Sequence, residues 1–253
     1  MADLPPLLFL HGAFAGPEVW TRFVAPWFAA RGHRVAAPRL NRTGGPPLRL
    51  RDYVRTARGA AEDLGGRPVV IGHSLGGFVA QHLAAEGRAA GTVLVASPGP
   101  LGLGPTLWRL SAVSRAVLAV LMATQAGQGA LAGGVEALRR ALFTEAVPEA
   151  WIREVMVEMA PESPAVLFDA LTWDLPAWPL ARMTPTLGLS GDRDAFLPVS
   201  ELWALALAYG AEIELLPGRG HGLPIDPHWR SLAWRINAWL DEHRIGARAE
   251  AAA

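Results

Sequence analysis

Short runs of apolar residues recur along the chain, and each is closed by Gly, Pro or polar residues. Six of these runs are rich in Val, Ile and Leu without a clean alternation of polar and apolar positions: residues 6–10, 34–37, 68–71, 92–96, 186–189 and 212–216. Strands that are apolar on both sides are typical of a parallel sheet covered by helices on both faces. The pattern therefore predicts six parallel strands.

Most gaps between these runs carry apolar residues at helical spacing. In residues 17–31, Trp20, Val24 and Phe28 recur every four positions, with Pro17 at the start and Gly32 just past the end. The other predicted helices are residues 50–64, 77–87, 200–210 and 229–243. Strands and helices thus alternate, which predicts a doubly wound α/β fold with helices on both faces of one sheet.

One gap breaks this alternation. Between Ala96 and Thr186 no good strand occurs, and four helical stretches are predicted at residues 105–123, 135–142, 148–160 and 163–173. Clusters of Gly and Pro mark both ends of the gap. The chain is therefore expected to have a core of residues 1–97 and 185–253, with a four-helix insertion at residues 98–184.

Composition excludes several classes of function. The 253 residues include no Cys, which rules out disulfides, thiol nucleophiles and thiolate metal sites. The seven His residues lack metal-ligand spacing, and 23 basic residues balance 23 acidic ones. We expect no metal, no cofactor and no nucleic-acid partner. Without a signal peptide or a stable membrane span, a cytoplasmic monomer or homodimer is expected.

The most informative motif lies between the third predicted strand and the helix that follows it. Residues 72–76 read Gly-His-Ser-Leu-Gly, the Gly-x-Ser-x-Gly pattern. A strand, a sharp turn and a helix form a nucleophile elbow, which exposes the serine hydroxyl above the end of the sheet. The pattern alone is weakly specific in a chain with 27 Gly. Ser74 as a nucleophile therefore needs support from other parts of the sequence.

A serine nucleophile needs a base and an acid that orients the base. His221 follows the last predicted strand and is flanked by glycines, which give its loop the freedom to place the imidazole over Ser74. The acid should follow an earlier strand, where residues 191–198 offer Asp192 and Asp194. The spacing Gly-x-x-Asp-x-x-x-Pro favours Asp194, whereas Asp192 is better suited to capping the turn through its own backbone.

The reaction also needs backbone N–H donors for the oxyanion. Leu75, directly after Ser74, can supply one donor. Residues 11–14 (His-Gly-Ala-Phe) follow the first strand and can supply the second, from Ala13. His11 precedes the elbow, whereas the acid and His221 follow it, so we interpret His11 as structural, bonding within its own loop.

These four segments, in this order, resemble the α/β-hydrolase family. The resemblance implies acyl transfer through a covalent ester on Ser74, followed by hydrolysis, and implies that the insertion is a variable cap. Members of that family usually carry two further strands before the His-Gly loop. Here only ten residues precede His11, so those two strands are expected to be absent and the sheet to be entirely parallel.

The predicted pocket is apolar. Phe14, Phe196 and Leu223 lie beside the three catalytic segments, and Trp108 and Phe168 belong to apolar helices of the insertion. Such a lining suits an apolar acyl or ester substrate, so a carboxylesterase or small lipase acting on uncharged esters is the favoured function. A thioesterase, a C–C bond hydrolase, a perhydrolase or a lyase could use the same triad, and a non-catalytic ligand receptor could use the same scaffold.

Overall fold

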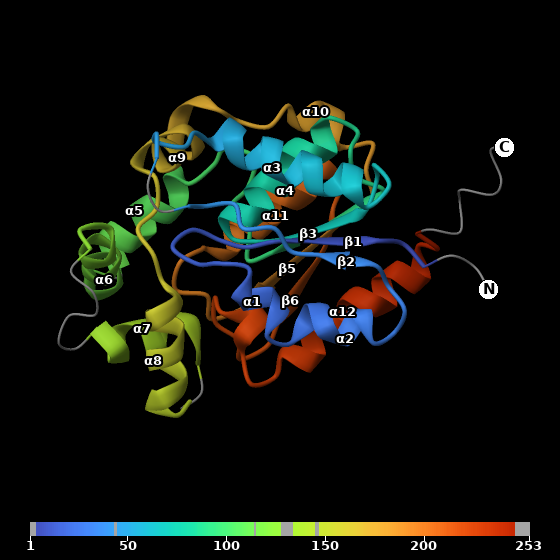
Figure 1. The fold of residues 1–253 in the computed structure, drawn as a ribbon. Coiled ribbons are helices and arrows are strands. Elements are labelled where there is room, and N and C mark those ends of the chain that lie inside the picture. The colour runs from blue at the N-terminus through green and yellow to red at the C-terminus, as the bar shows by residue number, and fades with distance from the viewer. Residues whose placement is uncertain (1–3, 43–44, 114, 128–133, 145–146, 246–253) are drawn as a thin grey trace, which may run out of the picture.

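The computed structural model describes residues 4–42, 45–113, 115–127, 134–144 and 147–245 (Figure 1). Within them, one sheet contains six strands in the order β2-β1-β3-β4-β5-β6, and all neighbouring pairs are parallel. The strands are β1 (Leu7–Leu10), β2 (Val35–Ala36), β3 (Val69–His73), β4 (Gly91–Val95), β5 (Thr186–Gly191) and β6 (Glu212–Leu216). The six-stranded, all-parallel sheet that the apolar runs predict is confirmed.

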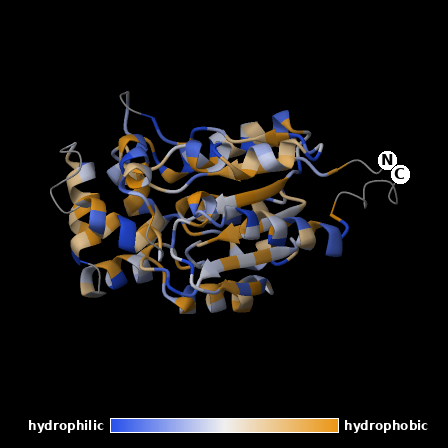
Figure 2. Ribbon diagram, turned by 90° about the horizontal axis from the view of Figure 1, so that it is seen from below, coloured by the Kyte–Doolittle hydropathy of each residue, from blue (hydrophilic) through white to orange (hydrophobic). Residues whose placement is uncertain are grey.

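Helices cover both faces of the sheet (Figure 1). One face is covered by α1 (Glu18–Thr21), α2 (Val24–Ala29) and α12 (Trp229–Glu242). The other face is covered by α3 (Leu50–Asp63), α4 (Leu75–Ala85) and α11 (Val199–Tyr209). The doubly wound arrangement is therefore confirmed as well. Figure 2 shows that strands at the centre are largely hydrophobic, whereas the outer helices carry both hydrophobic and hydrophilic residues.

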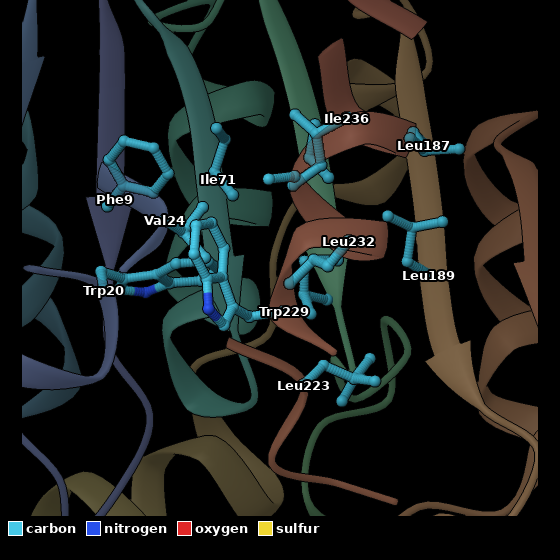
Figure 3. Packing of buried hydrophobic residues seen from close by; sticks show 14 of the residues in the cluster. Phe9, Trp20, Val24, Ile71, Leu187, Leu189, Leu223, Trp229, Leu232 and Ile236 are labelled. Atoms are coloured by element: carbon cyan, nitrogen blue, oxygen red, sulfur yellow. The ribbon is translucent and has the colours of Figure 1, made fainter. Parts of the chain in front are cut away.

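Successive strand residues pack into two different cores. Leu7 and Phe9 of β1 join the cluster that contains Trp20 and Trp239, part of which is shown in Figure 3. Leu8 and Leu10 of the same strand join the cluster on the opposite face. Because each face is buried beneath helices, both sets of positions must be apolar. This explains why the strand sequences do not alternate.

The predicted helix at residues 17–31 is two helices, α1 and α2. Phe23 between them has a non-helical backbone, with φ −138° and ψ −59°. Pro26 has no N–H to donate to the carbonyl of Arg22, so a continuous helix would lose a hydrogen bond there. The chain instead begins a new helix with Pro26 in its first turn.

The segment between β4 and β5 contains helices and no strand among its described residues. Its helices are α5 (Gly104–Val113), α6 (Arg115–Gln125), α7 (Gly134–Leu142), α8 (Glu149–Glu158), α9 (Pro164–Phe168), a π-helical turn (Asp169–Trp173) and α10 (Trp178–Ala181). We call residues 98–184 the insertion. In Figure 1, α5 to α8 lie beside one end of the sheet rather than over a face.

The single helix expected at residues 105–123 is bent by 115° into α5 and α6. This stretch is apolar on several sides, and a straight helix can bury only one of them. The bend lets α5 bury Leu110 while α6 buries Val117 and Val120. No single helix in the described ranges has the length and apolarity to cross a membrane, and only this bent pair, taken together, meets that test by length and composition.

The direction in which the chain crosses the sheet changes at β1. The connection from β1 to β2 runs through α1 and α2 on one face, and the return to β3 runs through α3 on the other. Loops that leave the carboxyl ends of β1 and β3 therefore diverge, and such a switch point is where α/β sheets form a crevice. Leu10, the last residue of β1, pairs with Gly72, so β3 ends only one residue beyond β1.

Candidate active site

Ser74 lies at the turn between β3 and α4 in a strained backbone conformation. Its φ is 52° and its ψ is −122°, a region that residues with a side chain rarely occupy. The Ser74 N–H donates to the carbonyl of Val95 at 3.0 Å, which ties the turn to the neighbouring strand. The conformation is that of a nucleophile elbow, in which the hydroxyl projects from the end of the sheet.

The glycines of the motif are required by close backbone contacts. A Cβ on Gly72 would lie 2.3 Å from the carbonyl oxygen of Gly76, and a Cβ on Gly76 would lie 2.3 Å from that of Leu10. At both positions the obstacle is backbone, which cannot rotate away as a side chain can. The Gly-x-Ser-x-Gly spacing thus allows α4 to start directly against β1 and β3.

His221 and Asp194 form a hydrogen-bonded pair. The Nδ1 of His221 lies 2.8 Å from Oδ2 of Asp194, and both side chains are buried. The other carboxylate oxygen, Oδ1, accepts hydrogen bonds from the N–H groups of Phe196 at 2.7 Å and Leu197 at 2.9 Å. The carboxylate is therefore held in one orientation, so that it can fix the imidazole and stabilise a positive charge on it.

Asp192, the other acidic candidate, is not paired with His221. Its Oδ1 accepts a hydrogen bond from the N–H of Gly218 at 2.7 Å. The expectation that Asp192 caps its turn through its own backbone is wrong in this respect, because the bond joins the loop after β5 to the loop after β6. Asp192 thus holds the two loops together.

Two aromatic rings pack against the imidazole of His221. The ring centroid of Phe196 lies 4.4 Å away and that of His73 lies 4.8 Å away. The Nε2–H of His73 also donates to the carbonyl of His221 at 2.9 Å. Burial lowers the pKa of His73 to about 3, so this ring stays neutral and keeps that proton. The sequence did not reveal this contact, because 148 positions separate the two residues.

The loop after β1 packs directly on Ser74. A Cβ on Gly12 would lie 3.0 Å from the Cβ of Ser74. His11 fixes this loop: its Nδ1–H donates to the Gly12 carbonyl at 2.9 Å, and its Nε2 accepts from the N–H of Leu40 at 2.9 Å. Burial lowers the pKa of His11 to about 4 and keeps it neutral. The within-loop bond is the one expected from the sequence, and the bond to Leu40 is additional.

One proposed oxyanion donor, Ala13, lies in this loop, and the other, Leu75, lies in the elbow. Leu75 is the first residue of α4, so its N–H has no acceptor within the helix. Ala13 lines the same cavity as Ser74. An anion beside the N–H of Leu75 would also meet the positive end of the α4 dipole.

A cavity of about 210 Å³ connects these groups to the insertion. Ser74 and His221 both line it, and none of the described lining residues is charged. The polar side chains of the lining belong to His73, Ser74, Thr106 and His221. The apolar part comes largely from the insertion: Leu103, Leu107, Leu110, Leu118, Leu121, Met122, Leu138, Leu142, Val155, Met159, Leu167 and Leu171.

The five predicted pocket residues fall into two groups. Phe14 and Phe196 line the cavity. Trp108 and Phe168 do not, being 71% and 56% exposed, and Leu223 is buried in the core while its neighbours form the lining. In α5 the residues that line the cavity share the face opposite Trp108, which the all-round apolar sequence did not reveal. The prediction of Trp108, Phe168 and Leu223 as pocket residues is therefore wrong.

A possible cation site occurs elsewhere among the described residues. Glu212, Glu242 and His243 place one ligand atom each within 4.8 Å of one another. They lie on β6 and at the end of α12, and none of them lines the cavity. Exposed acidic groups often gather in this way without an ion, so we assign no metal to them.

A parallel sheet with a serine elbow after β3 and a His–Asp pair after β6 and β5 defines the class of α/β hydrolases. The alpha/beta hydrolase family model matches residues 7–233. The chain belongs to this family.

Individual relatives agree with this assignment. A pimeloyl-(acyl-carrier protein) methyl ester esterase from Aromatoleum aromaticum is 40% identical over 80 residues, which are 32% of this chain and 31% of that protein. An esterase from Thermogutta terrifontis has a TM-score of 0.69 at 20% identity, with 96% of this chain and 91% of that chain covered. The naproxen esterase of Bacillus subtilis has a TM-score of 0.69 at 19% identity, with 95% of this chain and 85% of that chain covered. The structural matches show a shared fold.

Proposed function

We propose that this protein is a serine hydrolase that cleaves carboxylic esters with apolar, uncharged acyl groups. The observation that carries the proposal is the His221–Asp194 hydrogen bond, at 2.8 Å, beside a cavity that Ser74 also lines. The strained Ser74 backbone supports the same role, since strain of this kind is found where a side chain must be presented to a substrate.

The proposed reaction follows from the groups around Ser74. His221 accepts the proton of the Ser74 hydroxyl as the oxygen attacks the ester carbonyl, and Asp194 stabilises the imidazolium. The N–H groups of Ala13 and Leu75 bind the developing oxyanion. His221 then protonates the leaving alcohol, which gives an acyl-enzyme on Ser74. A water activated by His221 hydrolyses this ester and restores the serine.

The substrate class follows from the lining. A carboxylate or ammonium group inside the cavity would lose its hydration without meeting an opposite charge, which costs several kcal/mol or more. An acyl chain or an aromatic group instead buries apolar surface against the leucines of the insertion. In this proposal the insertion is a cap that sets the length and shape of the acyl group. The curated relative, itself named as an ester-cleaving enzyme, is consistent with this interpretation.

The test combines turnover with covalent labelling. The wild-type protein should hydrolyse p-nitrophenyl esters and react with a fluorophosphonate probe, and Ser74→Ala should abolish both. Ser111→Ala is the matched control, because that hydroxyl is exposed and bonds only the Trp108 carbonyl in the described structure. Turnover that survives Ser74→Ala would refute the assignment of the nucleophile. Labelling without steady-state turnover of esters or thioesters would favour a ligand receptor.

A further inference from the structure

A buried acid of the insertion touches the loop that carries Ala13. Glu162, between α8 and α9, is only 2% exposed. One carboxylate oxygen, Oε2, accepts a hydrogen bond from the N–H of Phe14 at 3.3 Å. The other, Oε1, accepts from the N–H of Ser163 at 3.0 Å and from the hydroxyl of Tyr53. Glu162 thus joins the insertion to the loop after β1 and to α3.

Both backbone groups of Phe14 are held by the same short segment. Its carbonyl accepts a hydrogen bond from the N–H of Ala160 at 3.1 Å, while its N–H is bound by Glu162. Phe14 has a φ of 60°, a conformation that costs a non-glycine residue about 1 kcal/mol or more and must be maintained by its surroundings. Residues 160–162 provide that support.

This support reaches the proposed oxyanion donor through one peptide unit. The N–H of Phe14 belongs to the Ala13–Phe14 peptide, so fixing it restricts ψ of Ala13, and the N–H of Ala13 lies on the other side of the same Cα. The backbone of Glu162 is bound by the side chain of Gln125 of α6. The N–H of Glu162 donates to Oε1 of Gln125 at 3.1 Å, and the carbonyl of Glu162 accepts from Nε2 of Gln125 at 2.8 Å. The position of the acid is therefore set by the insertion.

We propose that Glu162 is a positioning residue that aligns the N–H of Ala13, so that the insertion completes the active site as well as covering it. The proposal rests on the proposed function, because it assigns Ala13 to the oxyanion. Its structural part, that Glu162 fixes the Ala13–Phe14 peptide, can be measured independently.

The chain offers a matched control in Asp169. This carboxylate is equally buried and also ties the insertion to the core, since it pairs with Arg49 and accepts from the N–H of Leu50 at 3.1 Å. It makes no described contact with residues 11–14. A variant at Asp169 therefore loosens the insertion without removing the support of the loop.

The experiment compares Glu162→Ala, Glu162→Gln and Asp169→Asn by kcat and KM for a p-nitrophenyl ester, together with amide hydrogen exchange at Phe14. Losing one oxyanion donor costs 10²–10³ in kcat, so misaligning one should lower kcat about 10- to 100-fold in Glu162→Ala, with KM within about twofold. Exchange at Phe14 should rise by about tenfold or more. Asp169→Asn should leave kcat within about twofold and exchange at Phe14 unchanged.

Glu162→Gln should rescue part of the loss. The amide can still accept from Phe14 through its oxygen and donate to the Tyr53 hydroxyl, but then leaves the N–H of Ser163 unsatisfied. Equal kcat losses in Glu162→Ala and Asp169→Asn, or wild-type kcat in Glu162→Ala, would overturn the proposal while leaving the esterase assignment intact. If the wild-type protein had no turnover, the proposed esterase function would be refuted. If amide exchange at Phe14 were unchanged in Glu162→Ala, the proposal that Glu162 fixes the Ala13–Phe14 peptide would be refuted separately.

Discussion

The loops of the core and the insertion are fixed by different kinds of contact. In the core, backbone lies against backbone: a Cβ on Gly76 or on Gly191 would fall 2.3 Å and 2.1 Å from a carbonyl oxygen. An approach of this kind also occurs inside the insertion, between Gly102 and the carbonyl of Ala170, but the hydrogen bonds and ion pairs that tie the insertion to the core mostly involve side chains, such as the pairs of Arg22 with Glu158 and of Arg49 with Asp169. Backbone contacts tolerate no change in shape, whereas side-chain ties can be altered one at a time. Substitutions in the two regions should therefore differ in kind.

The largest effect should come from the acid of the core. Asp194→Asn should lower kcat about 10⁴-fold, or about 5 kcal/mol, because the amide cannot hold the imidazole in the tautomer that accepts the Ser74 proton. Asp192→Asn should stay within about threefold, since its amide oxygen can still accept from Gly218. Both variants are compared by p-nitrophenyl ester hydrolysis. The reverse order would move the acid to Asp192.

The backbone packing of the core is tested by Gly76→Ala. The added methyl meets the Leu10 carbonyl, so the strand and the helix must separate, and the free energy of unfolding should fall by about 3 kcal/mol. Gly59→Ala is the control, because a Cβ there meets nothing within 4 Å in the middle of α3. That variant should gain about 0.5–1 kcal/mol. Urea unfolding followed by circular dichroism measures both, and similar values would contradict this account.

The buried His11 should make the core sensitive to acid. Folding lowers its pKa from 6.5 to about 4, so the unfolded chain binds this proton first as the pH falls. Its contribution to stability is complete above pH 6.5, declines below that, and should have lost about 3 kcal/mol by pH 4. His11→Gln should remove this part of the pH dependence. If the free energy of unfolding fell equally in the two proteins between pH 7 and pH 4, His11 would not be the cause.

The smallest effect should come from the insertion and should depend on the substrate. Leu121→Ala removes three carbons from the cavity lining, and each buried methylene group is worth about 0.8 kcal/mol, so KM for an octanoyl ester should rise about tenfold or more. An acetyl ester, which does not reach the leucines, should be affected less than about twofold. Trp108→Ala, on the exposed face of α5, should change neither value. Equal changes for both esters would mean that the acyl group lies elsewhere.

The same contrast explains which parts of the molecule were predictable. The strands were predicted within about two residues, since burial on both faces demands unbroken apolar runs, and each close backbone approach at the elbow demands a glycine. These constraints act on single positions or on neighbours in sequence. In the insertion, apolar residues surround the helices, so the sequence could not tell that Trp108 faces solvent while Leu110 faces the cavity.

Pairs of residues far apart in the chain were not predictable either. Glu162 lies between two prolines and has the sequence context of an ordinary surface loop, and its partner Phe14 is 148 positions away. His73 was assigned only a place on the elbow, although it lies against His221. Asp194, by contrast, was predictable because the spacing of its own loop carries the information.

The insertion touches the three loops that carry Ala13, Asp194 and His221. Arg109 of α5 donates to the carbonyl of Asp194 at 3.2 Å, and Leu142 at the end of α7 accepts from the N–H of Gly222, next to His221, at 2.9 Å. Together with the hydrogen bond from the N–H of Ala160 to the carbonyl of Phe14, these contacts surround the site. A chimera that received another helical segment here would inherit an intact sheet and elbow, yet it would have to reproduce three separate anchor points before its loops kept their shape. To exchange the substrate range by grafting, the donor segment must first reproduce these contacts with the core. Only then can the residues that line its cavity be chosen.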